Sequence, residues 1–180
     1  MAMGVAVHCA VLEPDHFESR FVRGPDDRRG KKWTEALEEH GGRLLTSGDY
    51  DDAIEVRDAL RFDPIISKLV GLQTMREPSA FAPCPETGLI RRCRPDAYDA
   101  RSALMADLKV TTDARPEQFA RRVEQFGYHA QEAHYTDTWS AAGGGDVAAF
   151  AFIAVERDPP YAYSIYELEP TAVDEGRAII

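Results

Sequence analysis

The first part of the chain has the hydrophobic pattern of short helices joined by polar loops. Apolar residues and good helix formers fill most positions from Met3 to Leu12, which predicts a helix that ends near Glu13 and Pro14. The stretch from Asp15 to Gly30 has no apolar period and contains glycine and proline, so a loop is expected there. The pattern further predicts an amphipathic helix over 33–40, an extended piece over 44–46, a longer helix capped by Ser47 or Asp49 that runs to Phe62, and a short helix over 65–69.

The second part of the chain has strand patterns between helical ones. Strands are expected at residues 73–81, 88–94, 104–111, 148–156 and 163–168, the first two as a hairpin or meander. A helix is expected from Pro116, with Asp113 as its N-cap, and the pattern breaks near Gly127 and Tyr128 before a helix continues. Another helix begins at Pro170. Helices and strands in this order predict an α/β (α+β) fold.

Two charged residues interrupt the apolar strand 104–111. Asp107 and Lys109 are two positions apart, so both side chains project from one face of the strand. A buried charge needs a partner or a metal, because burying it unpaired is costly. Asp96 stands eleven positions before Asp107, at the end of the run 89–94. A turn over 97–102 is expected to fold the two runs into a hairpin that brings these carboxylates together.

Two carboxylates and an ammonium at the edge of a sheet suit a phosphodiesterase that depends on a divalent metal. Mg²⁺ prefers hard oxygen ligands, lowers the pKa of a bound water and neutralises the charge that develops on a phosphate. A lysine can orient or deprotonate that water. The competing interpretation is a buried Asp–Lys salt bridge, because an isolated D-x-K pattern is common by chance. Glu77 is either a third carboxylate near the metal or an edge-strand charge.

The order Pro-Asp, ten intervening residues and Asp-Leu-Lys resembles the PD-(D/E)xK nuclease superfamily. The longer stretch RCRPDAYD…MADLKVTTDARPEQFARRVEQFGYHAQEAHYTD is similar to the RecE-type (exodeoxyribonuclease VIII-like) exonuclease domain. The opening with Gly4, His8 and Leu12-Glu13-Pro14 is similar to that family as well. The resemblance covers nearly the whole chain. It implies a restriction-endonuclease-like core, in which a mixed central β-sheet is flanked by helices. It also implies a Mg²⁺-dependent deoxyribonuclease that acts as an exonuclease on linear duplex DNA in phage-type recombination or repair.

The same resemblance implies roles for individual residues. Metal ligands are expected at His8, Asp96, Asp107 and the backbone carbonyl of Leu108. Imidazole suits Mn²⁺ better than Mg²⁺, so either ion is a candidate. The residues expected to form the catalytic site are Asp96, Asp107, Lys109, Gln131 and Tyr135. Gln131 and Tyr135 are four positions apart and therefore lie on one face of a helix.

The formal net charge of −10 argues against binding of nucleic acid by the whole surface. Between Arg91 and Arg122, however, eight basic residues stand against five acidic ones. A second basic cluster lies in a predicted loop, at Arg28, Arg29, Lys31 and Lys32. An acidic protein with a local excess of basic residues suits an enzyme that holds DNA only in its channel. A solvated surface of mixed charge has the same composition. The residues expected to contact DNA are Arg92, Arg94, Thr111, Arg121 and Arg122.

The chain has three cysteines, Cys9, Cys84 and Cys93, at wide spacing. An odd number without a C-x-x-C pair predicts free thiols in a reducing compartment. Three cysteines also exclude an iron–sulfur cluster, which needs four. No apolar run is long enough to span a bilayer, and the apolar N-terminus lacks the basic residues of a signal peptide. We therefore expect a cytoplasmic protein without membrane contact.

A length of 180 residues and a hydrophobic content of 44% predict one domain. Residues 1–72 are expected to form a helical scaffold, 73–169 the sheet and catalytic core, and 170–180 the start of a C-terminal helix. Against RecE-like domains the chain looks shortened at both ends. The implied partners are double-stranded DNA ends, a single-strand annealing protein and further copies of the chain in a ring. The open alternatives are a RecB-like nuclease or endonuclease, a non-catalytic DNA-binding module on a decayed nuclease fold, and a purely structural domain.

Overall fold

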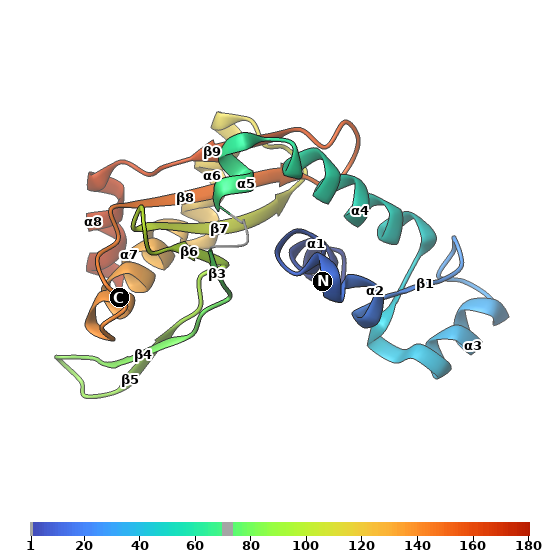
Figure 1. Ribbon diagram of the computed structural model, residues 1–180, viewed down its shortest axis with the longest axis horizontal. Helices are drawn as coiled ribbons and strands as arrows, with labels where there is room; N and C mark the ends of the chain where they lie inside the picture. Colours follow the sequence, from blue (N-terminus) through green and yellow to red (C-terminus); the bar gives the residue numbers. More distant parts are fainter. Residues whose placement is uncertain (1, 70–73) are drawn as a thin grey trace.

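A central mixed β-sheet runs through the molecule, with helices on both sides (Figure 1). The computed structural model describes residues 2–69 and 74–180. The sheet has the strand order β3-β6-β7-β8-β9, formed by β3 (Met75–Arg76), β6 (Ala97–Asp99), β7 (Leu104–Thr111), β8 (Ala149–Glu156) and β9 (Tyr163–Tyr166). β7 and β8 are parallel, and the other neighbouring pairs are antiparallel. This arrangement confirms the predicted α/β (α+β) class with a mixed central sheet.

The remaining elements surround this sheet. The helices are α1 (Ala2–Leu12), α2 (Pro14–Arg20), α3 (Lys31–His40), the 3₁₀ helix η1 (Gly41–Arg43), α4 (Ser47–Arg61), α5 (Pro64–Leu69), α6 (Pro116–Phe126), α7 (Tyr128–Ala141) and α8 (Pro170–Ile179). Two strand pairs lie outside the central sheet: the parallel pair β1 (Val22–Arg23) and β2 (Leu44–Leu45), and the antiparallel hairpin β4 (Ala80–Pro83) and β5 (Ile90–Cys93). Figure 1 shows this hairpin projecting away from the central sheet.

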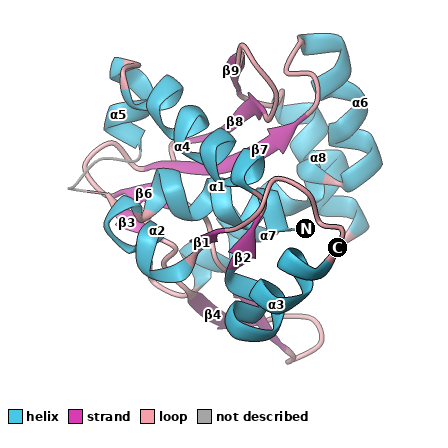
Figure 2. Ribbon diagram, turned by 90° about the vertical axis from the view of Figure 1, so that its right-hand side faces the viewer, coloured by secondary structure: helices cyan, strands magenta, loops and turns pink. Residues whose placement is uncertain are grey.

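The alternation of side chains along β7 assigns the helices to opposite faces of the sheet. Ala106 and Leu108 pack in a cluster with buried residues of α1 and α4, and Figure 2 shows α1 in front of β7. Met105 packs in a second cluster, to which α6 and α7 contribute. Asp107 and Lys109 follow Met105 at intervals of two, so they face α6 and α7. The sequence prediction that these two charges share a face is consistent with this placement.

One predicted loop contains a helix. The sequence predicts a loop over residues 15–30, whereas the structure has α2 and β1 there. Pro14 stands in the first turn of α2, where no backbone N–H is needed and the fixed φ of proline fits. Phe17 is the buried residue of this helix, and a single apolar side chain in a polar stretch gives no periodic signal. Pro14 therefore ends one helix and begins the next.

The expected hairpin between residues 89–94 and 104–111 does not form. β5 pairs with β4, and β7 pairs with β6, which lies in the segment expected to be the turn. Ala97 stands opposite Ala106 in the β6–β7 pair, so Asp96 comes next to position 107. The two carboxylates are neighbours, but by a different strand pairing. The strand expected from Gln73 and the expected border at 72/73 fall at residues outside the described ranges.

The helix caps also differ from those expected. Thr46 caps α4 by accepting a hydrogen bond from the N–H of Asp49 at 3.0 Å. Arg115 is the N-cap of α6, and its N–H donates to the carboxylate of Asp113 at 3.0 Å. Asp49 and Asp113 therefore each contact the N-cap residue of a helix without being the cap.

The three cysteines are free thiols, as predicted. Within residues 2–69 and 74–180, none of the helices has the length and apolar character needed to cross a membrane.

Candidate active site

Three polar side chains from β7 and α7 form a closed triangle. Lys109 Nζ lies 2.6 Å from Asp107 Oδ1 and donates a hydrogen bond to Gln131 Oε1 at 2.8 Å. Gln131 Nε2 in turn donates to Asp107 Oδ2 at 2.7 Å. Asp107 is only 4% exposed, so the triangle satisfies a charge that β7 carries into the interior. Gly127, at φ 67°, ends α6 at the predicted break and lets α7 begin at once, with Gln131 in its first turns.

Aromatic rings form a wall beside Lys109. Its Nζ lies 4.4 Å from the ring centroid of Tyr128 and 5.7 Å from that of Phe152. An ammonium is attracted to the face of an aromatic ring, and the attraction is larger where water is excluded. Sequence reasoning missed both rings. Phe152 stands opposite Asp107 in the β7–β8 register, and one strand alone does not reveal the residue that faces it on another strand.

Asp96 lies where β6 stops covering the edge of β7. The β6–β7 pairing ends at Ala97 and Ala106, and the N–H of Leu108 donates instead to Asp96 Oδ2 at 2.6 Å. His8 of α1 places its Nδ1 3.4 Å from the same oxygen. The structure therefore brings together residues from the first helix, the start of β6 and the middle of β7, as the sequence prediction requires.

The pKa shifts show an excess of negative charge at this place. Burial raises the pKa of Asp107, and the neighbouring Asp96 carboxylate raises it further against the opposing effect of Lys109. Burial lowers the pKa of His8, but its hydrogen bond to Asp96 and the charge of that carboxylate outweigh burial and raise the pKa above its ordinary value. Burial, and then the charges of Asp107 and Asp96, raise the pKa of Tyr135, which lies one turn after Gln131.

The chemistry of these side chains fits a hard divalent cation. Asp96 and Asp107 offer carboxylate oxygens, His8 offers an imidazole nitrogen, and the crowded negative charge favours a cation. Within the described part of the chain, however, no three His, Cys, Asp or Glu side chains are already grouped closely enough to hold a metal. Lys109 and Gln131 occupy both oxygens of Asp107. A cation would compete with them for this carboxylate.

Two predicted residues have other contacts. Arg94 donates to the carboxylate of Glu77 at 2.5 Å, and the N–H of Glu77 donates to the carbonyl of Asp96 at 2.9 Å. Glu77 therefore braces the segment that carries Asp96 and is paired with an arginine. Thr111 is 4% exposed, and its hydroxyl donates to the carbonyl of Asp113 at 3.1 Å. This contact leaves Thr111 out of the DNA surface proposed below.

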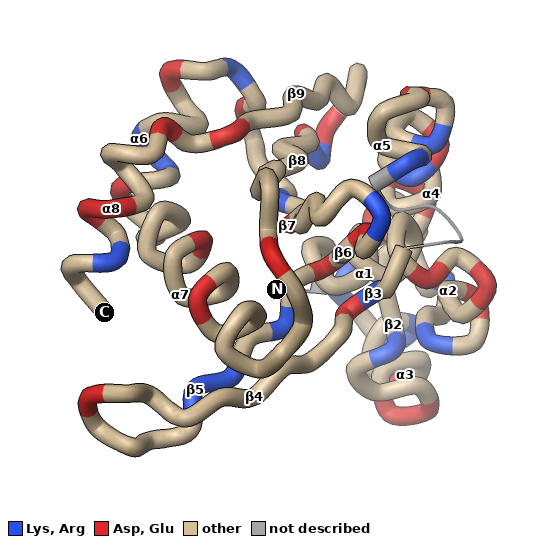
Figure 3. Tube along the Cα trace, turned by 60° about the vertical axis from the view of Figure 1, so that its left-hand side comes forward, with Lys and Arg blue, Asp and Glu red and all other residues tan. Residues whose placement is uncertain are grey.

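The other predicted DNA contacts lie on two elements. Arg92 of β5 is exposed and stacks over Phe81 at 5.7 Å, and its backbone carbonyl is 3.0 Å from His134 Nε2 of α7. Figure 3 shows the basic residues of β5 near α7. Arg121 of α6 is exposed, whereas Arg122 donates to the hydroxyl of Thr112 at 2.9 Å. The hairpin and α6 therefore both present arginines, and both elements contact α7.

Comparison with known proteins supports this architecture. A family described as "PDDEXK-like domain of unknown function (DUF3799)" matches residues 1–180. The crystal structure of a "Putative exonuclease" from Eubacterium rectale aligns with a TM-score of 0.68 at 15% identity, over 98% of this chain and 61% of that one.

The present chain thus spans less than two thirds of that neighbour. The structure of SSO0001 aligns with a TM-score of 0.40 at 12% identity, over 73% of this chain and 57% of that one, which is too weak to support an argument. No curated protein matched. Because the family model covers every residue, the chain belongs to this PDDEXK-like family and with it to the PD-(D/E)xK nuclease superfamily.

Proposed function

We propose that this chain is a divalent-metal-dependent nuclease of the RecE type that hydrolyses phosphodiester bonds at the ends of linear duplex DNA. The observation that carries the proposal is the buried triangle of Asp107, Lys109 and Gln131 beside Asp96. A structural salt bridge would need Asp107 and Lys109 alone. It does not account for a second carboxylate whose charge raises the pKa of the first.

The metal is proposed to be Mg²⁺ or Mn²⁺, held by His8, Asp96, Asp107 and the carbonyl of Leu108. Such an ion supplies a bound water of lowered pKa and neutralises charge on the phosphate. Lys109 has an ammonium fixed by three contacts, so it can hold a water or phosphate oxygen in a set direction. Gln131 holds that ammonium by accepting a hydrogen bond from it.

The proposed substrate surface is local, because the chain as a whole is acidic. Arg92 on β5 and Arg121 and Arg122 on α6 are proposed to contact phosphates. Arg94 is also proposed to contact a phosphate, because it lies two residues after Arg92 in the chain. Its ion pair with Glu77 would compete with that contact. A single-strand annealing protein and a ring of several copies remain proposed partners, as does a role in recombination or repair.

The test is digestion of end-labelled linear duplex DNA with Mg²⁺ or Mn²⁺. The native chain is expected to release labelled nucleotides. Lys109→Met is expected to lower the rate by roughly 10²–10⁴-fold, the range for loss of a group acting on a proton in the transition state. Asp107→Asn is expected to lower the rate as well, because it removes a proposed metal ligand. Lys68→Met, at an exposed lysine of α5, is the matched control and should leave the rate unchanged. Equal rates for the native chain and both site variants would contradict the proposal.

Covalently closed circular DNA of the same sequence distinguishes an exonuclease from an endonuclease of the same fold. An exonuclease leaves the circle intact, so cleavage of the circle would support the endonuclease alternative. DNA binding without cleavage of any substrate, in either metal, would support the non-catalytic DNA-binding module.

Metal titration separates the nuclease from a purely structural domain. A site that binds Mn²⁺ only in the folded state should stabilise the fold by about 2.7 kcal/mol at a hundredfold excess over Kd. The Tm of the native chain should therefore rise with Mn²⁺, and Asp96→Asn should reduce this rise. A Tm that is independent of Mn²⁺ would favour a structural Asp–Lys pair.

A further inference from the structure

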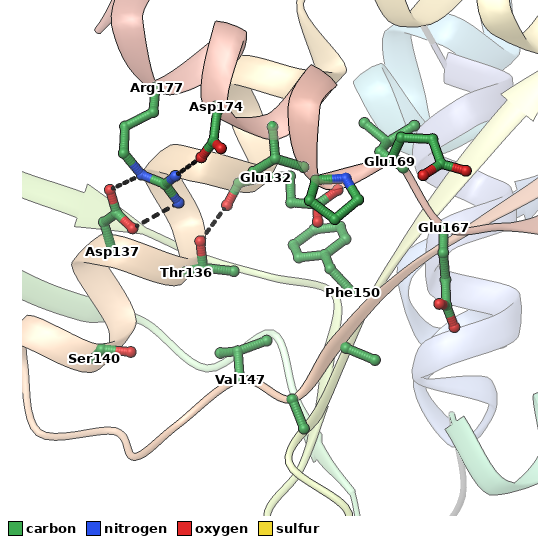
Figure 4. A pocket seen from close by; sticks show the side chains of 15 residues that line it. Glu132, Thr136, Asp137, Ser140, Val147, Phe150, Glu167, Glu169, Asp174 and Arg177 are labelled. Carbon is green, nitrogen blue, oxygen red and sulfur yellow. Dashed lines mark hydrogen bonds and ion pairs between the residues drawn. The ribbon is translucent and has the colours of Figure 1, made fainter.

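A pocket lies beside α7, between that helix, α8, the start of β8 and the segment after β9. Its volume is about 610 Å³, within the usual range of ligand pockets. Gln131 and Glu132 are neighbours in the sequence, yet Gln131 bonds to Asp107 and Glu132 lines this pocket. Figure 4 shows Glu132 between Arg177 on one side and Glu167 and Glu169 on the other.

The pocket has more negative than positive groups. Its lining includes five carboxylates and one guanidinium: Glu132, Asp137, Glu167, Glu169, Asp174 and Arg177. The guanidinium is already committed, because Arg177 Nε and Nη2 donate to Asp137 at 2.9 and 3.2 Å, and Nη1 donates to Asp174 at 2.7 Å. Among the residues that line the pocket, these contacts leave none of the three glutamates in an ion pair.

Glu132 is the group that these contacts leave unsatisfied. It is 8% exposed, and among the described residues its Oε2 has no hydrogen-bond partner. An unpaired carboxylate in such a place is costly, so native structures normally pair it. Burial, and to a smaller degree the charge of Glu167, raise the pKa of Glu132 to about 7 against the opposing charge of Arg177. The site therefore has a buried acceptor that faces a cavity large enough for a partner.

Apolar side chains complete the pocket. Phe150, Leu168 and Val173 line it together with the carboxylates. A bare metal ion would use neither this apolar surface nor the volume. Within the described ranges, moreover, the acids are not grouped as a metal site. A cation on an aliphatic stem uses both features, since the stem covers apolar surface while the charged end pairs with a carboxylate.

We infer that this pocket binds a guanidinium or primary ammonium group carried on an aliphatic stem, with Glu132 as its main charged partner. Such a group belongs either to a free small molecule or to an arginine or lysine side chain of a protein. The inference does not depend on the proposed nuclease activity, because none of the catalytic side chains lines the pocket.

The test is isothermal titration calorimetry with N-butylguanidine, a guanidinium on a four-carbon stem, at pH 7. The native chain should bind one equivalent, and Glu132→Gln should bind at least tenfold more weakly. Glu175→Gln changes an exposed acid of α8 that is outside the pocket lining, so it should bind like the native chain. N-butylurea, which has a similar shape without the charge, should not bind.

Proton linkage gives a second readout. Pairing with a cation favours the charged form of Glu132, so binding at pH 7 should release protons, and the measured heat should depend on the ionisation enthalpy of the buffer. Glu132→Gln should lose this dependence. Glu167 and Arg177 face the same group, and Glu167→Gln should keep most of the proton release.

A capped Gly-Arg-Gly peptide identifies the source of the cation. Tighter binding of the peptide than of N-butylguanidine would assign the pocket to a protein side chain, and the reverse order would assign it to a free small molecule. Absence of saturable binding of both probes would overturn the inference. So would equal binding of N-butylguanidine to Glu132→Gln and Glu175→Gln, or binding of N-butylurea as tight as that of N-butylguanidine.

Discussion

At the scale of single residues, Gln131 holds the candidate active site together. Its amide accepts from Lys109 and donates to Asp107, so one side chain fixes both ends of the Asp–Lys pair. Gln131→Ala should lower kcat for duplex degradation by roughly 10- to 100-fold, because the ammonium would lose its fixed direction. It should also lower the free energy of unfolding by about 1–3 kcal/mol, the usual cost of leaving buried polar groups without a partner.

Gln125→Ala is the matched control for this change, because Gln125 is exposed on α6. Single-turnover kinetics and urea unfolding measure the two effects separately. Gln131 is a positioning residue, so its loss should act on kcat more than on KM. An unchanged kcat with only reduced stability would show that Gln131 serves the fold alone.

Glu132, the next residue, should make stability depend on pH. Its pKa is raised from 4.5 to about 7 in the folded chain, so the folded state holds a proton that the unfolded state releases. Stability should therefore fall as pH rises between about 4.5 and 7, and level off above that, by up to about 3 kcal/mol. Urea unfolding across this range should show the fall, and Glu132→Gln should flatten it relative to Glu175→Gln. A native profile that the substitution leaves unchanged would contradict the assignment.

At the scale of elements, strong hydrophobic periodicity was sufficient to predict single helices and strands. It was not sufficient to predict how the strands pair. The apolar patterns of residues 3–12, 104–111 and 148–156 predict α1, β7 and β8 within a few residues. The pairing of β7 with β6 could not be predicted, because β6 has three residues inside a segment with turn composition. The common face of Asp107 and Lys109 was still predictable, because their spacing of two residues fixes it. The contact of Lys109 with the ring of Phe152 could not be predicted, because it depends on the register between β7 and β8.

The contact between α7 and α8 depends on a glycine. A Cβ added at Gly176 would lie 2.4 Å from the backbone carbon and oxygen of His129 on α7, which is closer than real contacts allow. Gly176→Ala should therefore separate the two helices and lower the free energy of unfolding by about 1–3 kcal/mol, the usual cost of overpacking. Gly4→Ala is the matched control, because Gly4 is helical with open space around it and should gain about 0.5–1 kcal/mol. Urea unfolding of both variants decides this, and equal effects would show that α8 packs more loosely than described.

At the scale of the whole molecule, the candidate site depends on both layers of helices. α1 supplies His8 and packs on the face of β7 opposite to α7, which supplies Gln131. The sheet lies between these helices, and the carboxylates meet where β6 leaves the edge of β7 exposed. The residues expected to bind a metal are separated by about a hundred positions, so their convergence is a property of the complete fold and of none of its segments alone.

The uneven distribution of charge leads to a prediction about DNA binding. The chain has a formal net charge of −10, so attraction to DNA must come from a few basic side chains at the site. Arg92 and Arg121 are exposed and have no ion-pair partner within residues 2–69 and 74–180, whereas Arg23 is paired with Asp51 at 2.6 Å. Each phosphate contact adds about 0.9 to the slope of log Kobs against log salt.

Arg92→Gln and Arg121→Gln should therefore each reduce the magnitude of that slope by about 0.9, and the double variant by about 1.8. Binding to linear duplex is measured by fluorescence anisotropy between 50 and 200 mM salt, in a Lys109→Met background that prevents hydrolysis. Arg23→Gln is the control, because its guanidinium is held by Asp51 near the end of the molecule occupied by β1 and α3 in Figure 1. If all three arginines changed the slope equally, the interaction would be a general effect of net charge, and the β5 and α6 surface would have no special part in holding DNA.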